Sequence, residues 1–183
     1  MGGSSAPSYT YAVWSDITVN QVLSNGDLTI TQAPAGWNSA RASQGHIGVD
    51  ESFESQVGGA TTWIVGVANS SQTLANYLGI GADGWGVYAA GFSMHNGATA
   101  DVTAFNVGDW ILTEIDRTNG ELRQYLVSDG ISRTLLKTFD ISAEAAVALF
   151  PAVGLFGSSA VANFGQTPLI GPLSAGIREG IYE

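Results

Sequence analysis

The chain has 183 residues, of which 45% are hydrophobic and only 12% are charged, with a formal net charge of −10. This length suits one domain with a sizeable core rather than two. Six Lys and Arg residues form no basic cluster, which argues against binding to nucleic acid or to an anionic membrane surface. The absence of cysteine excludes disulfides, cysteine-ligated zinc and a thiol nucleophile.

No targeting signal is expected in the first residues. They lack the basic and apolar segments of a signal peptide, and Ala6 stands where a myristoylation signal has Ser or Thr. No apolar run reaches membrane-spanning length, so no membrane insertion is expected. An average soluble domain has roughly 25% charged residues. So low a charge content is more typical of a subunit packed in an assembly than of a free enzyme.

Residues 1–16 are expected to form an N-terminal arm and a lead-in strand within 11–18, and a turn at 24–27 leads into a strand at 27–31. Segment 61–68 is apolar on both faces and reads as a central strand. Its Trp63, Val65 and Val67 would face one side, with Ile64, Gly66 and Ala68 on the other.

Residues 85–90 predict another strand, and 109–127 predict a hairpin around the two-residue turn Asn119-Gly120. A turn at 128–130 follows, then a short helix or ordered loop at 142–149. Strands are expected at 150–156 and 161–164, followed by a tail at 166–183 that packs on the domain or on a neighbour. The pattern predicts an all-β, two-sheet antiparallel sandwich over residues 17–165, with at most one short helix.

An ordered series of short motifs resembles the SPRY (B30.2) domain, a sandwich with a concanavalin-like, jelly-roll outline. The series comprises Ile64-Val-Gly-Val-Ala68, Leu78-Gly79, Gly84-Trp-Gly-Val-Tyr88, Asn96-Gly97, Phe105-Asn-Val-Gly-Asp-Trp-Ile111, Asp116-Arg-Thr-Asn-Gly-Glu-Leu122, Phe150-Pro-Ala-Val153 and Asn163-Phe-Gly165. Residues 24–31 and 37–42 resemble the opening strands of that family. Residues 45–50 stand where the family has the strand that precedes the Ile-Gly-Val segment.

This resemblance implies binding of protein or peptide through loops at one end of the sandwich, without catalytic machinery. Related modules occur in bacteriophage virion proteins. The low charge and the composition rich in Gly, Ala, Ser, Thr and Asn favour a relation to those virion proteins. The expected partners are therefore protein subunits, either copies of this chain or other virion proteins, and the expected location is the virion.

The strongest enzymatic alternative is the motif Glu114-Ile115-Asp116. Alternate residues of a strand share a face, which puts the two carboxyl groups roughly 6.5–7 Å apart, and glycosidases use such pairs. A two-residue turn would set Asp116 opposite Arg123 and Glu114 opposite Tyr125. An ion pair with Arg123 would keep the pKa of Asp116 low, so the pair is interpreted as a solvated hairpin face.

No metal or cofactor is expected. His46 and His95 lack metal-ligand spacing, and His95 reads as a loop residue. Asp83 and Asp101 are only a weak indication of calcium. The sequence holds neither a nucleophile elbow nor a phosphate loop.

Aromatic residues carry the binding hypothesis. The tryptophans at 63, 85 and 110 fall in strand motifs and are expected in the core. The candidate binding residues in or beside loops are Trp37, Arg41, Tyr77, Asp83, Tyr88 and His95. A module that contacts proteins is the first interpretation, a lectin-like module that binds cell-surface glycan is the alternative, and a glycoside hydrolase is a third.

Overall fold

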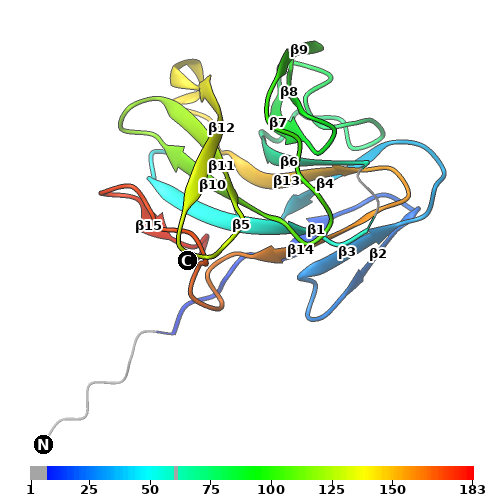
Figure 1. Ribbon diagram of the computed structural model, residues 1–183, viewed down its shortest axis with the longest axis horizontal. Coiled ribbons are helices and arrows are strands. Elements are labelled where there is room, and N and C mark those ends of the chain that lie inside the picture. The colour runs from blue at the N-terminus through cyan, green and yellow to red at the C-terminus, as the bar shows by residue number, and fades with distance from the viewer. Residues whose placement is uncertain (1–7, 60–61) are drawn as a thin grey trace, which may run out of the picture.

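Two packed β-sheets make up the computed structural model, which describes residues 8–59 and 62–183 (Figure 1). The seven-stranded sheet has the order β1-β4-β13-β6-β7-β8-β9. Its strands are β1 Trp14–Asp16, β4 Asn38–Ala42, β13 Phe150–Leu155, β6 Trp63–Ala68, β7 Gly84–Tyr88, β8 Phe92–His95 and β9 Ala98–Asp101.

The second sheet has eight strands, in the order β12-β11-β10-β5-β14-β3-β2 with β15 beside β5. They are β12 Arg133–Asp140, β11 Glu121–Val127, β10 Trp110–Asp116, β5 Glu51–Val57, β14 Ser159–Asn163, β3 Thr29–Gln32, β2 Gln21–Ser24 and β15 Arg178–Glu179. All pairings are antiparallel except that of β15 with β5. The expected all-β, two-sheet sandwich is confirmed.

The core lies between the sheets, and β6 shows how the sequence fills it. Trp63, Val65 and Val67 point into the main core, whereas Ile64 and Ala68 belong to a second apolar cluster on the outer face. Strand β6 lies between β13 and β7, and all six of its residues are buried. The expected central strand with two apolar faces is therefore confirmed for its described residues, and residue 61 lies outside them.

A loop, residues 69–83, covers the outer face of the seven-stranded sheet. Its Leu78 is fully buried over glycines of two strands, Gly84 and Gly86 of β7 and Gly154 of β13. A Cβ atom on Gly154 would lie 2.9 Å from the Leu78 backbone nitrogen, and one on Gly86 would lie 3.2 Å from its Cδ2. The missing side chains let the loop approach the sheet closely.

The C-terminal tail covers the outer face of the eight-stranded sheet in the same way. Leu169 and Leu173 pack against the buried Leu112, Tyr125 and Val127. Further on, β15 pairs with β5, and the Ile181 side chain enters the main core. The tail is thus part of this domain.

The described part of the N-terminal arm runs against the end of the tail. The N–H of Ala12 donates to the carbonyl of Ile181 at 2.9 Å, and the rings of Tyr9 and Tyr11 lie 4.4 and 5.2 Å from that of Tyr182. Residues 1–7 of the expected arm lie outside the described residues.

The β10–β11 hairpin differs from the expected two-residue turn. Asp116 pairs with Glu121 and Glu114 with Arg123, so residues 117–120 form a four-residue loop. The Asp116 carboxylate accepts the backbone N–H of Asn119 at 2.9 Å, and Arg117 turns away to donate to three backbone carbonyls. These interactions draw two more residues into the turn.

Several other expectations about elements were wrong. The strand before β6 is β5, not residues 45–50, and β12 follows the turn at 128–130 without having been expected. His95 ends a strand instead of lying in a loop. The segment 142–149, by contrast, agrees with the expected short helix or ordered loop: it holds a three-residue 3-10 helix, Ser142–Glu144, followed by turns. Trp110 is half-buried beneath the tail rather than in the main core.

Candidate binding surface

Five aromatic rings gather on the outer side of the seven-stranded sheet. We name them the aromatic patch: Trp37, Tyr77, Tyr88, Phe92 and Phe156. The Trp37 ring lies 6.1 Å from Tyr77, 5.6 Å from Tyr88 and 6.0 Å from Phe156. Phe92 is 39% exposed and Phe156 37%, and the other three rings are half-buried. Chain segments far apart in sequence thus build one apolar surface.

The polar groups of this patch are available to a partner. Within the described residues, the Trp37 indole N–H and the hydroxyls of Tyr77 and Tyr88 make no hydrogen bond. The Trp37 ring stands at 69° to Tyr77 and 81° to Tyr88, which is edge-to-face packing rather than the coplanar platform a sugar-binding module presents. Rigid aromatic area with free hydrogen-bonding ends is the composition of a protein-contact hot spot.

Arg41 and Asp83 hold the loop that carries Tyr77. One guanidinium nitrogen of Arg41 donates to the carbonyl of Asn69 at 2.8 Å, and another pairs with Asp16 at 3.0 Å. The Asn69 side-chain amide donates to the Asp83 carboxylate at 2.9 Å. The structure therefore places both residues as supports at the base of loop 69–83.

His95 lies apart from the patch, on the inner face of the same sheet. Its ring stacks on Trp85 at 4.8 Å with an interplanar angle of 13°. Its Nδ1 donates to the carbonyl of Gly84 at 2.9 Å. Of the six candidate residues, the structure brings together Trp37, Tyr77 and Tyr88, supports them with Arg41 and Asp83, and separates His95.

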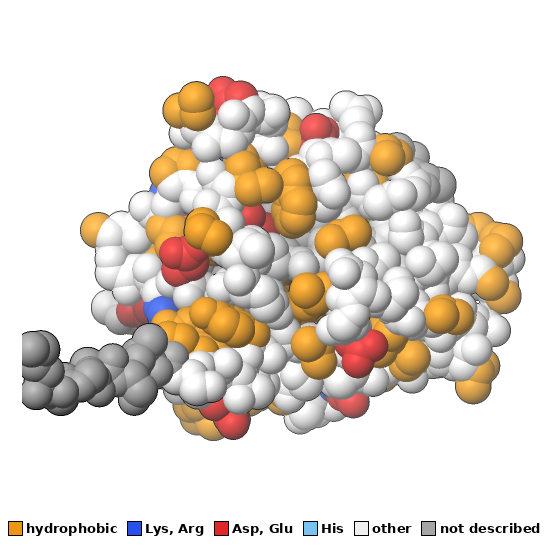
Figure 2. All heavy atoms as spheres, turned by 90° about the horizontal axis from the view of Figure 1, so that it is seen from below, with side chains coloured by type: hydrophobic (Ala, Val, Ile, Leu, Met, Phe, Trp, Pro, Cys, Tyr) orange, Lys and Arg blue, Asp and Glu red, His pale blue; other side chains and the backbone are white. Residues whose placement is uncertain are grey.

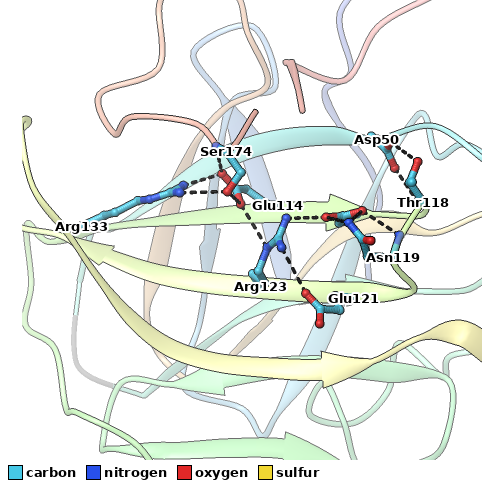
Figure 3. Close-up of polar contacts among 9 residues, drawn as sticks. Asp50, Glu114, Thr118, Asn119, Glu121, Arg123, Arg133 and Ser174 are labelled. Atoms are coloured by element: carbon cyan, nitrogen blue, oxygen red, sulfur yellow. Dashed lines mark hydrogen bonds and ion pairs between the residues drawn. The ribbon is translucent and has the colours of Figure 1, made fainter. Parts of the chain in front are cut away.

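The Glu114–Asp116 pair lies on a buried face rather than a solvated one. Arg123 reaches Glu114 at 3.4 Å and Asp116 at 2.5 Å. Arg133 also bonds to Glu114, so that both arginines point toward this carboxylate (Figure 3). Ser174 of the tail donates both its backbone N–H, at 2.7 Å, and its hydroxyl, at 2.8 Å, to the same Glu114 carboxylate.

The electrostatics of this network oppose acid catalysis by Asp116. Burial alone would raise the pKa of Asp116, but hydrogen bonds from Asn119 and the charge of Arg123 outweigh it and hold that pKa below its ordinary value. The expected ion pair between Asp116 and Arg123 is present, although Arg123 sits diagonally rather than opposite. A carboxyl that stays ionised cannot serve as the proton donor that a glycosidase needs.

A second buried carboxylate also binds the tail. Glu54 of β5 accepts the backbone N–H groups of Ile170, at 2.9 Å, and Gly171, at 2.8 Å. Burial raises the pKa of Glu54 despite these two hydrogen bonds. Glu54 and Glu114 are thus used to attach the tail to the sheet.

Among the described residues, no three His, Cys, Asp or Glu side chains come together in a way that could hold a metal ion. Asp83 and Asp101 contribute no such group. In the same part of the chain, no helix is long and apolar enough to cross a membrane.

Sequence reasoning missed Phe92 and Phe156. Phe156 directly follows a buried strand, and Phe92 begins a strand that enters the Asn96-Gly97 turn. An apolar strand and an Asn-Gly turn can be recognised in the sequence, but neither indicates which chain segments meet on one surface.

No family model matches the sequence, and no curated protein matches it either. Solved structures do match in fold. The TRIM65 PSpry domain superposes with a TM-score of 0.71 at 14% identity, over 84% of this chain and 92% of that one. The SPRY domain of human HERC1 gives 0.66 at 20% identity, over 88% of this chain and all of that domain. Stonustoxin gives 0.67 at 18% identity over 84% of this chain, which spans 27% of the toxin chain. The chain therefore has the SPRY fold.

Proposed function

We propose that the chain is a non-catalytic module that binds another protein through the aromatic patch. The observation that carries this is the patch itself: five clustered rings, two of them more than a third exposed, with unbonded polar groups on a surface poor in charge. Figure 2 shows how sparse blue Lys and Arg atoms are on one face of the molecule. Aromatic side chains in a nearly uncharged surround fit a desolvated protein contact.

The fold and the carboxylate network support the absence of catalysis. Solved structures of this fold include domains named PSpry and SPRY, and the sequence motifs resemble that family of protein-binding modules. Within the described residues, the carboxylates at 114 and 116 are bound by arginines instead of facing an open cleft.

We further propose that the partner is a subunit of a bacteriophage particle, either a second copy of this chain or another virion protein. The low charge supports a packed subunit. Because the tail packs on its own domain, the patch is a better candidate contact than the tail. Quantitative mass spectrometry of particles of a phage that encodes the chain should find it in fixed stoichiometry with the major subunits, and its absence from purified particles would refute the virion role.

The binding role is tested by selecting peptides from a displayed library on the whole chain, with counter-selection on a Tyr88→Ala variant. Tyr88 is half-buried at the end of β7, so the variant should fold. We expect selected peptides to lose about tenfold or more in affinity for Y88A and to keep it for the control Val22→Ala, whose side chain is 66% exposed on β2. Ligands that bind both variants equally, or glycan-array binding lost in Y88A, would contradict the proposal.

A further inference from the structure

Strand β9 leaves one edge of the seven-stranded sheet open. All four of its residues are exposed. Ser93 pairs with Ala100 and His95 with Ala98 across the Asn96-Gly97 turn, and the N–H of Val102 donates to Gly91. Ala98, Ala100 and Val102 therefore form the backbone hydrogen bonds to β8 and the residue before it. The N–H and C=O groups of the residues between them, Thr99 and Asp101, face outward, away from β8. The outward backbone of β9 can accept another strand.

A cleft of about 200 Å³ lies beside this edge, between the two sheets. It is lined by Ser93, His95, Ala98, Thr99, Ala100, Lys137 and Phe139. Ala98 pairs with His95 and Ala100 with Ser93, and these two in turn pair with the core residues Trp85 and Val87. The two alanine side chains therefore point to the inner face of the sheet. Because alanine side chains are short, this mouth of the sandwich is left unfilled.

Lys137 gives the cleft its charge. It is the sole lysine of the chain, and within the described residues it has no ion pair and no hydrogen bond. Its ammonium group lies 5.7 Å from the ring of Phe139. The five arginines, by contrast, all bond to carboxylates or backbone carbonyls.

The acidic residues of β9 and β12, Asp101 and Asp140, form no ion pair with Lys137. Asp101 is the cross-strand partner of Phe92, on the outer face of the seven-stranded sheet. Asp140 is the partner of Glu121, on the outer face of the eight-stranded sheet. Both positions face outward, away from the cleft. A lysine left without an anion in a chain of net charge −10 is therefore positioned for an anion from outside.

We propose that an extended acidic segment of a partner protein adds to β9 as a further strand and places a carboxylate in this cleft against Lys137. Backbone hydrogen bonds to Thr99 and Asp101 supply the pairing, and the ion pair with Lys137 selects an acidic residue at the inward position. The cleft lies on the face of the sheet opposite to the aromatic patch, so the ion pair with Lys137 can be tested independently of the function proposed for that patch.

The test is an amide-resolved NMR titration of the whole isotope-labelled chain with two extended peptides. The first is acetyl-Thr-Val-Thr-Glu-Thr-Val-Thr-amide, and the second has Gln in place of Glu. We expect the Glu peptide to shift the amides of residues 98–101 and of Lys137, and to bind about three- to tenfold more tightly than the Gln peptide.

Two variants separate the parts of the proposal. Lys137→Gln should abolish the preference for the Glu peptide while leaving the weaker backbone pairing. Thr99→Pro removes an outward N–H without removing a bond between β8 and β9, and it should abolish binding of both peptides. The control Thr134→Ala, on an exposed position of β12, should bind as the wild type does, and the melting temperatures of all variants should confirm folding.

Four results of the peptide titrations would overturn the proposal. They are equal affinity for the two peptides, shifts confined to other surfaces, unchanged binding by folded T99P, and no binding of either peptide at about millimolar concentration. If dilution of the chain alone shifts the β9 amides, the edge belongs to a second copy instead of an acidic partner, and the proposal is likewise overturned.

Discussion

The carboxylate of Glu114 accepts both the backbone N–H and the hydroxyl of Ser174, sixty residues further along the chain. Arg133 bonds to the same carboxylate and also donates to the Ser174 hydroxyl oxygen at 2.9 Å. One buried acid thus joins a central strand, an edge strand and the tail. The Glu114-Ile115-Asp116 motif, which resembles the carboxylate pair of a glycosidase, therefore holds strands and tail together.

Replacing Glu114 with Gln should therefore destabilise the fold. The charge of Arg133 would lose its partner in a buried setting, and one of the Ser174 contacts would be lost. We expect the free energy of unfolding to fall by about 2–4 kcal/mol, measured by urea denaturation.

Glu121→Gln is the matched control. Glu121 also binds Arg123, at 3.1 Å, but its side chain is 41% exposed, so its loss should cost less than about 1 kcal/mol. Neither variant nor the wild type should release sugar from β-glucan. Hydrolysis by the wild type that is lost in E114Q would contradict the structural role.

Glu54 predicts an unusual pH dependence of stability. Burial raises its pKa above the ordinary value of 4.5, so the folded state holds this proton more tightly than the unfolded state does. The contribution of Glu54 to stability is then greatest below pH 4.5 and is lost as the pH rises through the folded-state pKa. The stability of the wild type relative to Glu54→Gln should accordingly decrease between acidic and neutral pH, measured by urea unfolding. A relative stability that increases over that range would contradict the prediction.

For Asp116, the expected pH dependence of stability has the opposite sign to that of Glu54. Its pKa is held below the ordinary value of 3.8, so its contribution to stability is present above that pH and is lost as the pH falls through the folded-state pKa. At neutral pH, Asp116→Asn should cost about 1–2 kcal/mol, because Arg123 and Asn119 lose an ionised acceptor. That cost should shrink in unfolding measurements below about pH 4. A cost that does not change with pH would show that geometry rather than charge matters at this position.

The sandwich and its central strand could be predicted because their signals are local. Residues 63–68 are apolar at every position, and alternate side chains of a strand point to opposite faces, so the sequence alone predicts which side chains face the main core and which face the outer cluster. The hairpin register could not be predicted from Asn119-Gly120 alone. Arg117 bonds to carbonyls 27, 30 and 71 residues away, and these contacts fix the length of the turn.

Strand β5 was missed for a similar reason. Its buried face carries Glu54, a residue that is ordinarily exposed, and the groups that satisfy it lie 116 and 117 residues later in the chain. The aromatic patch has the same character, because Trp37, Tyr77 and Phe156 come from three separate segments. A sequence pattern identifies the types of residue that bind, but only the fold determines which of them meet.

Leu78 couples the fold to the patch, since it anchors the loop that presents Tyr77. Leu78→Ala should leave a cavity over the glycines of β7 and β13 and lower the free energy of unfolding by about 2–5 kcal/mol. The amide of Ser39, which donates to the carbonyl of Leu74 at 2.8 Å, should exchange with solvent faster as the loop loosens. In the control Leu135→Ala, a side chain 53% exposed on β12 is removed, and both quantities should stay near wild type. If Leu78→Ala lowered stability without faster exchange at Ser39, the loop would be held by its polar anchors, Arg41 and Asp83, rather than by Leu78.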